Sequence, residues 1–431
     1  MTTKQFLSSS AIDEGLVQTA GEQPPCNEWG CRIPLGFALF CFLSVPSLCR
    51  AQRHDVLCND GSGSFKGEFQ SVVTVQVTAA RNGKLATRAC EATLGWNKHS
   101  VMVATGASQV DIDAFGVDLG LGVPVVSFQV KKSNSDCCME YRIYSLEGSP
   151  TLLRTITGGD FFSAADTDLD GRVEIWTDDA RAVGNFENLT ATELGAGPTI
   201  VLRFAHGELL DVSSEFQPYF DQEIARLRNQ LDSEDLGDFK RSDGKLSPNA
   251  PFSAERLDHL RGVKAKILKI VWCYLYSGRE HEAWRSLAEM WPTTDADRIR
   301  AAILSARARG ISAQVNGVSA GGLRTRTKRA TIFDATSGSG GSKPEIIPPE
   351  PILLWRPPLM GSPNQGLSQT GRLLELVIDS AGKVRSAEPA GKTKSGDADL
   401  IHAATGWKFI PAYKAGRAVA SRMRLDLSLR Q

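Results

Sequence analysis

The spacing of hydrophobic and polar positions changes along the chain, and the first pattern favours β-strands. Between residues 56 and 205, short apolar or alternating runs such as "FQSVVTVQV" (69–77) and "MEYRIYSL" (139–146) are separated by turn-forming stretches such as "RNGK" (81–84). Alternating runs bounded by turn residues are typical of half-buried strands. This region is therefore predicted to be an all-β domain, either a sandwich or a partial, propeller-like sheet.

The second pattern, between residues 214 and 314, has the helical period. Apolar residues recur every three or four positions and form one stripe at Phe216, Phe220, Ile224, Leu227 and Leu231. Such a stripe predicts an amphipathic helix that packs on one side. A second helical run begins after Ser253, a good N-cap residue. We expect a helical domain here.

The third pattern, in residues 317–358, contains basic, Gly/Ser-rich and Pro-rich stretches in turn and is predicted to be a linker. Residues 360–431 then alternate again. "LLELVI" (373–378) and the turn "DSAGKV" (379–384) precede a short helix near 395–404, and a last strand is expected over 418–429. The predicted order is strand, strand, helix, strand, so the whole chain is expected to be multidomain α+β.

The last strand has two different faces. Its apolar face carries Val419, Ser421, Met423, Leu425, Leu427 and Leu429. The other face carries charged residues that include Arg422 and Arg424. A terminal strand with this pattern is expected to be held in a sheet, with one face packed and the other in water.

Overall charge excludes some functions, and the N-terminal pattern indicates export. Lys and Arg number 49, as do Asp and Glu, so no net field attracts nucleic acid or an anionic membrane.

Residues 33–49 carry no charge, but this run is shorter than the about 20 residues of a spanning helix. Residues 1–51 are predicted to be either a signal peptide cleaved after Ala51 or an uncleaved N-terminal anchor.

Export would place the cysteines in an oxidising compartment. Cys58, Cys90, Cys137 and Cys138 are then expected to form two disulfides within the first domain, with each of the adjacent cysteines bonded to a distant partner. Buried thiols are the alternative. The spacing of the cysteines does not match a tetrahedral zinc site.

One loop has the composition of a calcium site. "DTDLDGRVEIW" (166–176) places Asp166, Asp168, Asp170 and Glu174 around Gly171, which permits a sharp turn. Calcium requires six to eight oxygen ligands, and alternate Asp side chains on a turning loop converge on one point. The alternative is a polar turn whose carboxylates face water.

The stretch "GGDFFSAADTDLDGRVEIWTDD" (158–179) resembles a blade of FG-GAP, integrin-type propellers. The resemblance implies a structural Ca²⁺ held by the four acidic side chains and by the carbonyl of Arg172. "VDIDAFGVDLG" (110–120), with Asp111, Asp113 and Asp118, resembles a degenerate second copy.

The sequence shows no catalytic motif. None of the six histidines lies in a recognisable nucleophile or metal context, and we find neither a Gly-x-Ser-x-Gly stretch nor a phosphate-binding loop. We therefore expect a protein that is not an enzyme.

The C-terminal stretches "VIDSAGKV" (377–384), "WKFIPA" (407–412) and "GRAVASR" (416–422) resemble the TonB C-terminal domain family. The resemblance implies a periplasmic protein, free or anchored in the inner membrane, whose last strand binds an extended segment of an outer-membrane receptor by strand addition in energy-dependent transport. The binding residues it implies are Val419, Ser421, Arg422, Arg424 and Leu425. The alternative function is an extracytoplasmic, calcium-stabilised binding or scaffold protein without energy coupling, whose β domain recognises a ligand while the C-terminal module only aids assembly. For Arg422 and Arg424 themselves, the alternative is an edge strand whose charges only prevent aggregation.

Overall fold

The computed structural model describes most of the chain after the N-terminal segment. The described residues are 56–81, 88–132, 137–247, 253–319, 330–335, 346–354, 373–391 and 397–427. The predicted signal peptide or anchor (1–51) lies outside them. Within the described ranges, no helix combines the length and the apolar character that crossing a membrane requires.

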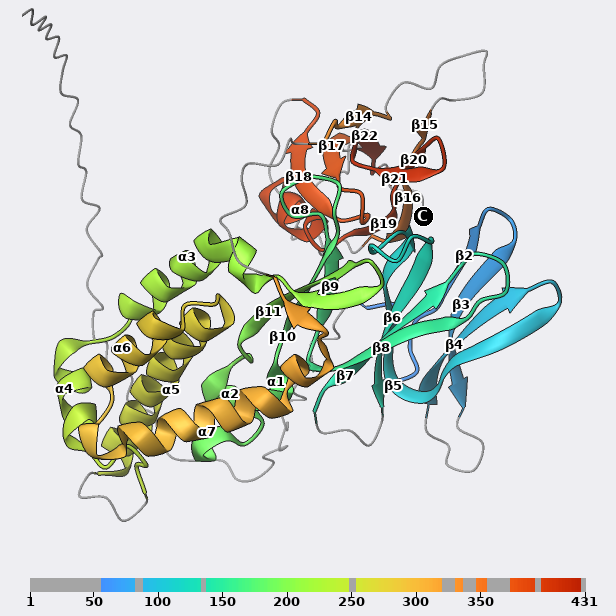
Figure 1. Ribbon diagram of the computed structural model, residues 1–431. Helices are drawn as coiled ribbons and strands as arrows, with labels where there is room; N and C mark the ends of the chain where they lie inside the picture. Colours follow the sequence, from blue (N-terminus) through green and yellow to red (C-terminus); the bar gives the residue numbers. More distant parts are fainter. Residues whose placement is uncertain are drawn as a thin grey trace, which may run out of the picture. The chain divides into compact units, whose positions relative to one another are not determined.

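The first strands form an eight-stranded antiparallel sheet, sheet A, in which successive strands are neighbours (Figure 1). The alternation seen in the sequence explains the pairing: Val73, Val75 and Val77 of β3 are fully buried on one face. Strand β1 pairs with the long strand β5, beside the meander of β2 to β8. The strands are β1 (Cys58–Asn59), β2 (Phe65–Phe69), β3 (Val73–Arg81), β4 (Arg88–Trp96), β5 (His99–Val117), β6 (Val125–Lys132), β7 (Met139–Ser145) and β8 (Leu152–Gly159).

Sheet B has five strands in the order β13-β12-β11-β10-β9. Its last member, β13, returns after the helices and pairs parallel with β12. The strands are β9 (Phe162–Ala165), β10 (Glu174–Asp178), β11 (Thr199–Ala205), β12 (Glu208–Asp211) and β13 (Gly317–Val318).

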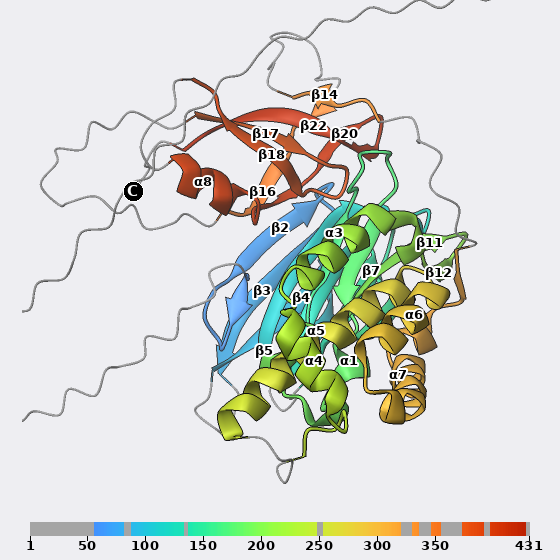
Figure 2. The same ribbon diagram turned by 90° about the vertical axis from the view of Figure 1, so that its left-hand side faces the viewer.

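The helices follow the predicted stripe. Phe220, Ile224 and Leu227 are the buried residues of α3, and the hydroxyl of Ser253 caps α5 by accepting from the N–H of Arg256 at 3.2 Å. Helix α5 contacts α3, α4 and α6, as Figure 2 shows. The helices in this part of the chain are α1 (Ala180–Val183), α2 (Ala191–Leu194), α3 (Gln217–Arg228), α4 (Ser233–Arg241), α5 (Ala254–Tyr276), α6 (Glu280–Met290) and α7 (Ala296–Arg309).

The predicted boundary between the β and helical regions does not separate two cores. One buried cluster contains Tyr141 of sheet A, Ile175 and Leu202 of sheet B, and Leu268 of α5. A sheet face and a helix stripe each need an apolar partner, and here they cover each other. The structure is mixed α+β, as the sequence predicted, and residues 53–431 form one unit.

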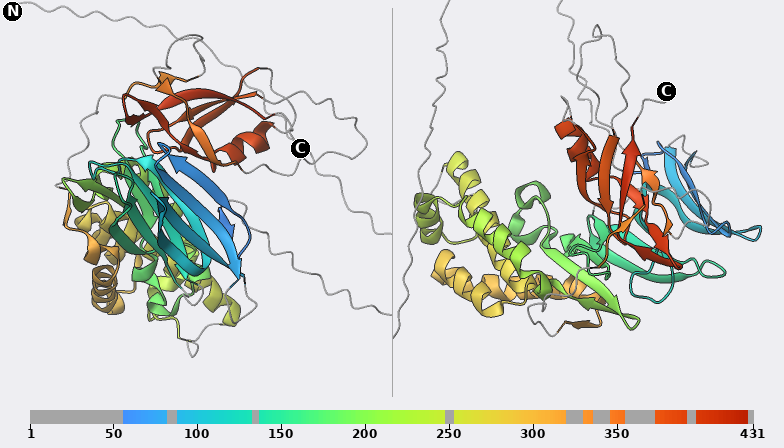
Figure 3. Two further views of the ribbon diagram at one scale, coloured as in Figure 1. Left: turned by 90° about the vertical axis from the view of Figure 1, so that its right-hand side faces the viewer. Right: turned by 90° about the horizontal axis from the view of Figure 1, so that it is seen from above.

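The C-terminal module contains two strands, β17 and β18, followed by helix α8 and four further short strands, where the sequence predicted a single strand after the helix. Its central sheet, sheet C, has the order β14-β22-β17-β18, and the helix beside these strands in Figure 3 is α8. Leu400 and Ala404 of α8 belong to the same core as Leu374 and Leu376 of β17. Two smaller pairings, β15-β20-β21 and β16-β19, complete the module. Its elements are β14 (Phe333–Asp334), β15 (Ile346–Ile347), β16 (Glu350–Leu353), β17 (Leu373–Ile378), β18 (Val384–Pro389), α8 (Asp397–Ala404), β19 (Lys408–Ile410), β20 (Ala412–Lys414), β21 (Arg417–Val419) and β22 (Ser421–Asp426).

The expected last strand is divided in two, which corrects the prediction of one strand over 418–429. β21 pairs with β20, whereas β22 pairs with β17, so the chain changes partners at Ala420. The alternation in β22 is confirmed: Ser421 is buried and Met423 partly buried, and Arg422 and Arg424 are exposed. Residues 428 and 429 lie outside the described part.

The cysteine prediction is half right. Cys58 and Cys90 form a disulfide, and both are fully buried. Cys137 and Cys138 are bonded to each other, so the expectation that each of them takes a distant partner is wrong. The physical reason is that Cys58 and Cys90 lie together on neighbouring parts of sheet A and satisfy each other.

We predict that the Cys58–Cys90 disulfide stabilises sheet A. It joins residues 32 positions apart, and closing a loop of that size lowers the entropy of the unfolded chain by an amount worth about 3–4 kcal/mol. The variant Cys58→Ala/Cys90→Ala should lose about that much unfolding free energy in denaturant titrations. A loss below about 1 kcal/mol would contradict the pairing.

Candidate functional site

The edge of sheet C at strand β22 is the structural counterpart of the partner-binding strand predicted from the sequence. β22 pairs antiparallel with β17 along its whole length, from Ser421 to Asp426. On its other side it pairs parallel with β14, a strand of only two residues. The N–H of Phe333 donates to the carbonyl of Ala420 at 3.0 Å, and the N–H of Ala335 donates to the carbonyl of Arg422 at 2.8 Å.

Strand β14 covers only the first half of this edge. Its register places Phe333 opposite Ser421 and Asp334 opposite Arg422. Arg424 and Leu425 lie beyond this pairing, on the second half of β22. The chain therefore adds a short strand of its own to the edge at which the sequence predicted a foreign strand.

Two side-chain contacts accompany β14. The ammonium of Lys414 lies over the ring of Phe333, 4.4 Å from its centroid, which is a favourable cation–π distance. Asp334 faces a cationic neighbour, since its register partner is Arg422. An aromatic residue followed by an acid therefore suits this edge.

The predicted arginines Arg422 and Arg424 lie on the exposed face of sheet C. Both guanidinium groups contact the same carboxylate, that of Glu375 on β17, at 3.4 Å. The two arginines share one carboxylate, and exposed Asp426 of β22 and Glu388 of β18 lie on the same face, so three acidic residues accompany the two arginines there. Val419 belongs to β21 and pairs with Ala412, so it is not part of the β22 edge.

The segment predicted as a linker supplies three of the strands in the C-terminal module. Besides β14, strand β15 pairs with β20, and strand β16 pairs with β19. Ile352 of β16 is buried in the same cluster as Phe69 of sheet A. The prediction that residues 317–358 only link domains is corrected, because their short apolar stretches find sheet edges to pair with.

The predicted calcium loop brings together three of its expected ligands. Carboxylate oxygens of Asp166, Asp168 and Asp170 lie within 4.8 Å of one another. Gly171 has a left-handed backbone (φ 87°), as expected of the residue that turns the loop. This set of oxygens suits a hard cation, and the three aspartates are the residues that would hold Ca²⁺.

Protein donors also satisfy these aspartates. The carboxylate of Asp166 accepts from the N–H groups of Asp170 and Gly171 at 2.9 and 3.0 Å. The guanidinium of Arg172 donates to Asp170 at 2.7 Å. Because it already binds Asp170, this guanidinium competes with any cation for that carboxylate. Burial, as the largest cause, raises the pKa of Asp166.

Glu174 does not join this group. It is fully buried on β10, paired in register with Ala165, and its carboxylate contacts the guanidinium of Arg203 at 3.4 Å. The side chain points to Arg203 because Glu174 belongs to a regular strand rather than to the loop.

The second, degenerate calcium loop is not a loop. Asp111 and Asp113 lie on strand β5, where they are 2% and 3% exposed. Asp118 accepts from the backbone N–H groups of Gly120 and Leu121 at 2.8 Å, so it closes a turn. The acids of this stretch serve other contacts.

Asp113 connects three parts of the fold. One carboxylate oxygen accepts from the hydroxyl of Tyr141 and from the N–H of Ala164, both at 2.7 Å. The other accepts from the ammonium of Lys383 at 2.6 Å. The ammonium of Lys408 contacts Asp111 in the same way. Two lysines of the C-terminal module are thus paired with two buried acids of sheet A.

The aspartate loop reinforces the same contact. The hydroxyl of Ser380, in the turn between β17 and β18, donates to Asp166 at 3.0 Å. The N–H of Asp166 donates to the carboxylate of Asp379 at 3.1 Å. The N–H of Ala330 donates to the carbonyl of Leu169 at 2.5 Å, three residues before Phe333. The loop therefore holds both the hairpin turn of the module and the start of the segment that forms β14.

The helical region contains a polar cavity that the sequence did not reveal. Its volume is about 490 Å³, and Glu187, Arg261 and Arg298 line it. Arg298 donates to Glu187 at 2.5 and 2.8 Å. Lys264, which is 1% exposed, lies 3.3 Å from the same carboxylate, and burial lowers its pKa. The charged groups pair with one another, so the buried ammonium of Lys264 has a carboxylate partner. In the sequence Lys264 is one of three lysines in this stretch, with Lys266 and Lys269, and nothing distinguishes it as the buried one.

In comparisons with known proteins, no family model, curated protein or solved structure matches this chain. The likeness to the TonB C-terminal domain and to FG-GAP blades therefore stays a prediction.

We predict that Lys383→Met destabilises the protein by about 3–5 kcal/mol, because it leaves the buried carboxylate of Asp113 without its cation. The double variant Lys383→Met/Asp113→Asn should recover part of the loss. An amide oxygen can still accept from Tyr141 and Ala164. Denaturant unfolding of the full chain measures both.

Lys66→Met is the matched control, because Lys66 is exposed on β2. It should change the unfolding free energy by no more than about 0.5 kcal/mol. Equal effects of the substitutions at Lys383 and Lys66 would contradict the ion pair.

We predict that Ca²⁺, added to chelator-treated protein at a hundredfold excess over its dissociation constant, stabilises the fold by about 2.7 kcal/mol. Asp168→Asn should abolish most of this gain, and Glu68→Gln, on an exposed position of β2, should leave it intact. Thermal unfolding with and without Ca²⁺ is the measurement. No gain in the unsubstituted protein, or the same gain in Asp168→Asn, would show that the loop binds no calcium.

Proposed function

We propose that this protein is a non-catalytic protein of the cell envelope whose C-terminal module binds an extended segment of a partner by strand addition at β22. The partner is an envelope protein, of which an outer-membrane receptor segment in energy-dependent transport is the case implied by the TonB-like motifs. The protein acts in the periplasm, free or anchored in the inner membrane by its N-terminal segment, and the aspartate loop holds a structural Ca²⁺.

The pairing of β14 with β22 is the observation that supports this proposal. The edge accepts a parallel strand through backbone hydrogen bonds from Phe333 and Ala335. Such bonds give strand addition its affinity, and side-chain contacts give it selectivity. A site that binds a segment of its own chain has the geometry for a similar segment of another chain.

Because β14 pairs over only two residues, a longer partner strand can replace it at β22. Each of the backbone bonds that Phe333 and Ala335 donate contributes about 0.5–1.5 kcal/mol, and the cation–π contact of Lys414 contributes about 0.5–1 kcal/mol. A longer partner strand that continues past Arg424 forms more bonds than β14 does. It can therefore displace β14 once it is present at sufficient concentration.

The contacts of β14 also describe the partner. An aromatic residue should lie under Lys414, as Phe333 does, and an acidic residue should follow it opposite Arg422. The position opposite Arg422, rather than a net charge of the whole face, is what favours an acidic residue in the partner.

A labelled peptide with the sequence of residues 330–335, "ATIFDA", tests the proposal on the full chain. We predict that Ala335→Pro binds this peptide about tenfold more tightly than the unsubstituted protein, as measured by fluorescence anisotropy. Proline removes the N–H that donates to Arg422, which weakens β14 by about 1–2 kcal/mol and opens the edge. Replacing the phenylalanine of the peptide by alanine should weaken binding.

Thr331→Pro is the matched control, because the N–H of Thr331 forms none of the backbone bonds described for this segment. It should leave the affinity of the peptide near that of the unsubstituted protein. Absence of binding to all three proteins, or equal affinity for all three, would contradict strand addition at β22.

A scaffold role without energy coupling is the second candidate, and the docking contacts favour it. Lys383 and Lys408 fix the C-terminal module to Asp113 and Asp111 of sheet A. A module held in this way can complete the core of the β region without binding any partner. Under that role the peptide experiment gives no binding, whereas Lys383→Met still destabilises the protein.

A further inference from the structure

Cys137, Cys138 and Asp160 form a second cluster of side chains that can bind a cation. Cys138 directly precedes β7, and Met139 of β7 pairs with Gly159 of β8. This register places Asp160, the next residue after Gly159, beside the cysteines. The ligand atoms of the three side chains lie within 4.8 Å of one another.

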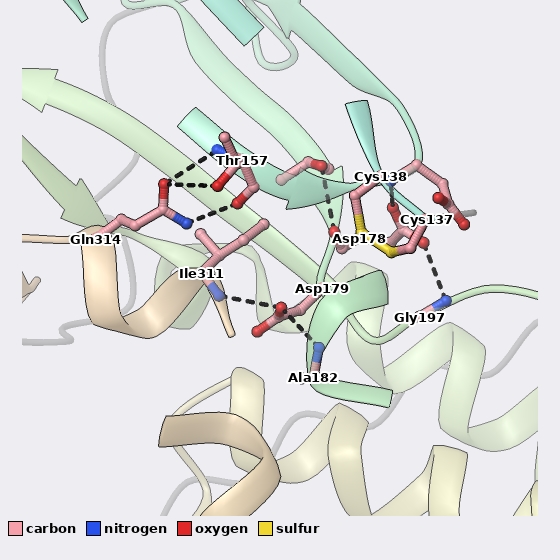
Figure 4. Close-up of a disulfide and its surroundings, with 11 residues drawn as sticks. Cys137, Cys138, Thr157, Asp178, Asp179, Ala182, Gly197, Ile311 and Gln314 are labelled. Atoms are coloured by element: carbon pink, nitrogen blue, oxygen red, sulfur yellow. Dashed lines mark hydrogen bonds between the residues drawn. A yellow bond between two sulfur atoms is a disulfide. The ribbon is translucent and has the colours of Figure 1, made fainter. Parts of the chain in front are cut away.

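Hydrogen bonds to the buried carboxylate of Asp178 hold the backbone at Asp160 in place. The N–H of Asp160 donates to Asp178 at 2.8 Å, and the N–H of Gly197 donates to the other oxygen of Asp178 at 3.0 Å, next to the disulfide in Figure 4. A side chain at Gly159 would meet Thr177 and the backbone of Asp178, so this strand end is tightly packed against β10. The backbone position of Asp160 is thus set before any ligand binds.

The two cysteine pairs of the described chain differ in access. Cys58 and Cys90 are fully buried, whereas Cys137 and Asp160 are exposed and Cys138 is partly exposed. Exposed disulfides are the ones that thiol reductants reach and open. Cys138 also has a left-handed backbone (φ 77°), which is uncommon outside glycine and which concentrates at functional sites.

The chemistry of the open pair suits a soft cation. Two thiolates and one carboxylate supply sulfur and oxygen ligands, the combination that zinc and its heavier congeners accept. Two thiolates on one tetrahedral zinc lie about 3.8 Å apart, given Zn–S bonds of about 2.3 Å. A carboxylate within 4.8 Å of both sulfurs can reach the same ion, and water completes the coordination.

We propose that Cys137, Cys138 and Asp160 bind a thiophilic divalent cation of the Zn²⁺ class when the Cys137–Cys138 disulfide is reduced, and release it when the disulfide re-forms. A dithiol reductant opens the bond: its two sulfurs become a disulfide, and Cys137 and Cys138 each gain a proton and one electron. The cation then replaces the two thiol protons, which pass to water. Re-oxidation by a disulfide of the same class reverses both steps.

Cadmium is the probe for this site, because cadmium thiolates show a charge-transfer absorption. The full chain, reduced with a phosphine that adds no competing thiol, should take up one more equivalent of Cd²⁺ than the variant Cys137→Ser/Cys138→Ser. The other cysteines are the same in both proteins, so the difference isolates this pair. The extra equivalent should be absent when both proteins are titrated before reduction.

Asp160→Asn tests the third ligand. It should weaken the binding of the extra equivalent at least about tenfold, since even an outer-shell partner of a metal has an effect of that size. Glu147→Gln, at the exposed turn between β7 and β8, is the matched control and should leave the affinity unchanged. Equal Cd²⁺ uptake by the reduced protein and the double serine variant, or an unchanged affinity in Asp160→Asn, would overturn the proposal.

Discussion

The ion pair between Asp113 and Lys383 is the contact on which most of this arrangement depends. Asp113 is a buried acid near the C-terminal end of the long strand β5, and its two oxygens are shared among Tyr141, the backbone of β9 and the ammonium of Lys383. A buried carboxylate is tolerated only where donors and a cation surround it. Sheet A therefore depends on the turn between β17 and β18, because Lys383 of that turn supplies the cation for Asp113. The neighbouring pair of Asp111 with Lys408 and the contact of Asp166 with Ser380 extend the same constraint.

Because buried ion pairs hold the C-terminal module in place, the segment of residues 330–335 can form β14 in the free protein and still give way to a partner strand. The loop of Asp166 to Asp170 holds the hairpin turn of the module and, through Leu169, the start of the segment that ends in β14. Beyond Ala330, β14 pairs with β22 over only two residues, and the N–H groups of Phe333 and Ala335 and the ammonium of Lys414 contribute to this contact. The module is fixed firmly by buried charges at one end, and its edge is covered weakly at the other. A binding edge that is covered by a short segment is protected from aggregation and stays available to a longer strand.

The sequence predicted local structure well wherever a periodic pattern determined it. The stripe of Phe220, Ile224 and Leu227, the N-cap Ser253 and the alternation in β22 are all confirmed. The predictions that failed depended on which distant residues meet. Asp113 looked like a loop ligand because the sequence does not show that Lys383 lies opposite it. The strands β14, β15 and β16 have too few residues to show a period, and they exist only because open edges accept them. Likewise, Glu174 fits the spacing of a ligand, but a regular strand directs it to Arg203.

Amide hydrogen exchange of the full chain tests the central claim, strand addition at β22, most directly. The amides of Phe333 and Ala335 should be protected in the free protein, because both donate to β22. A saturating amount of the "ATIFDA" peptide should remove that protection and leave the amides of β17 as slow as before. Protection of Phe333 and Ala335 that persists under saturating peptide would contradict the account, because the edge would then not exchange its own strand for another.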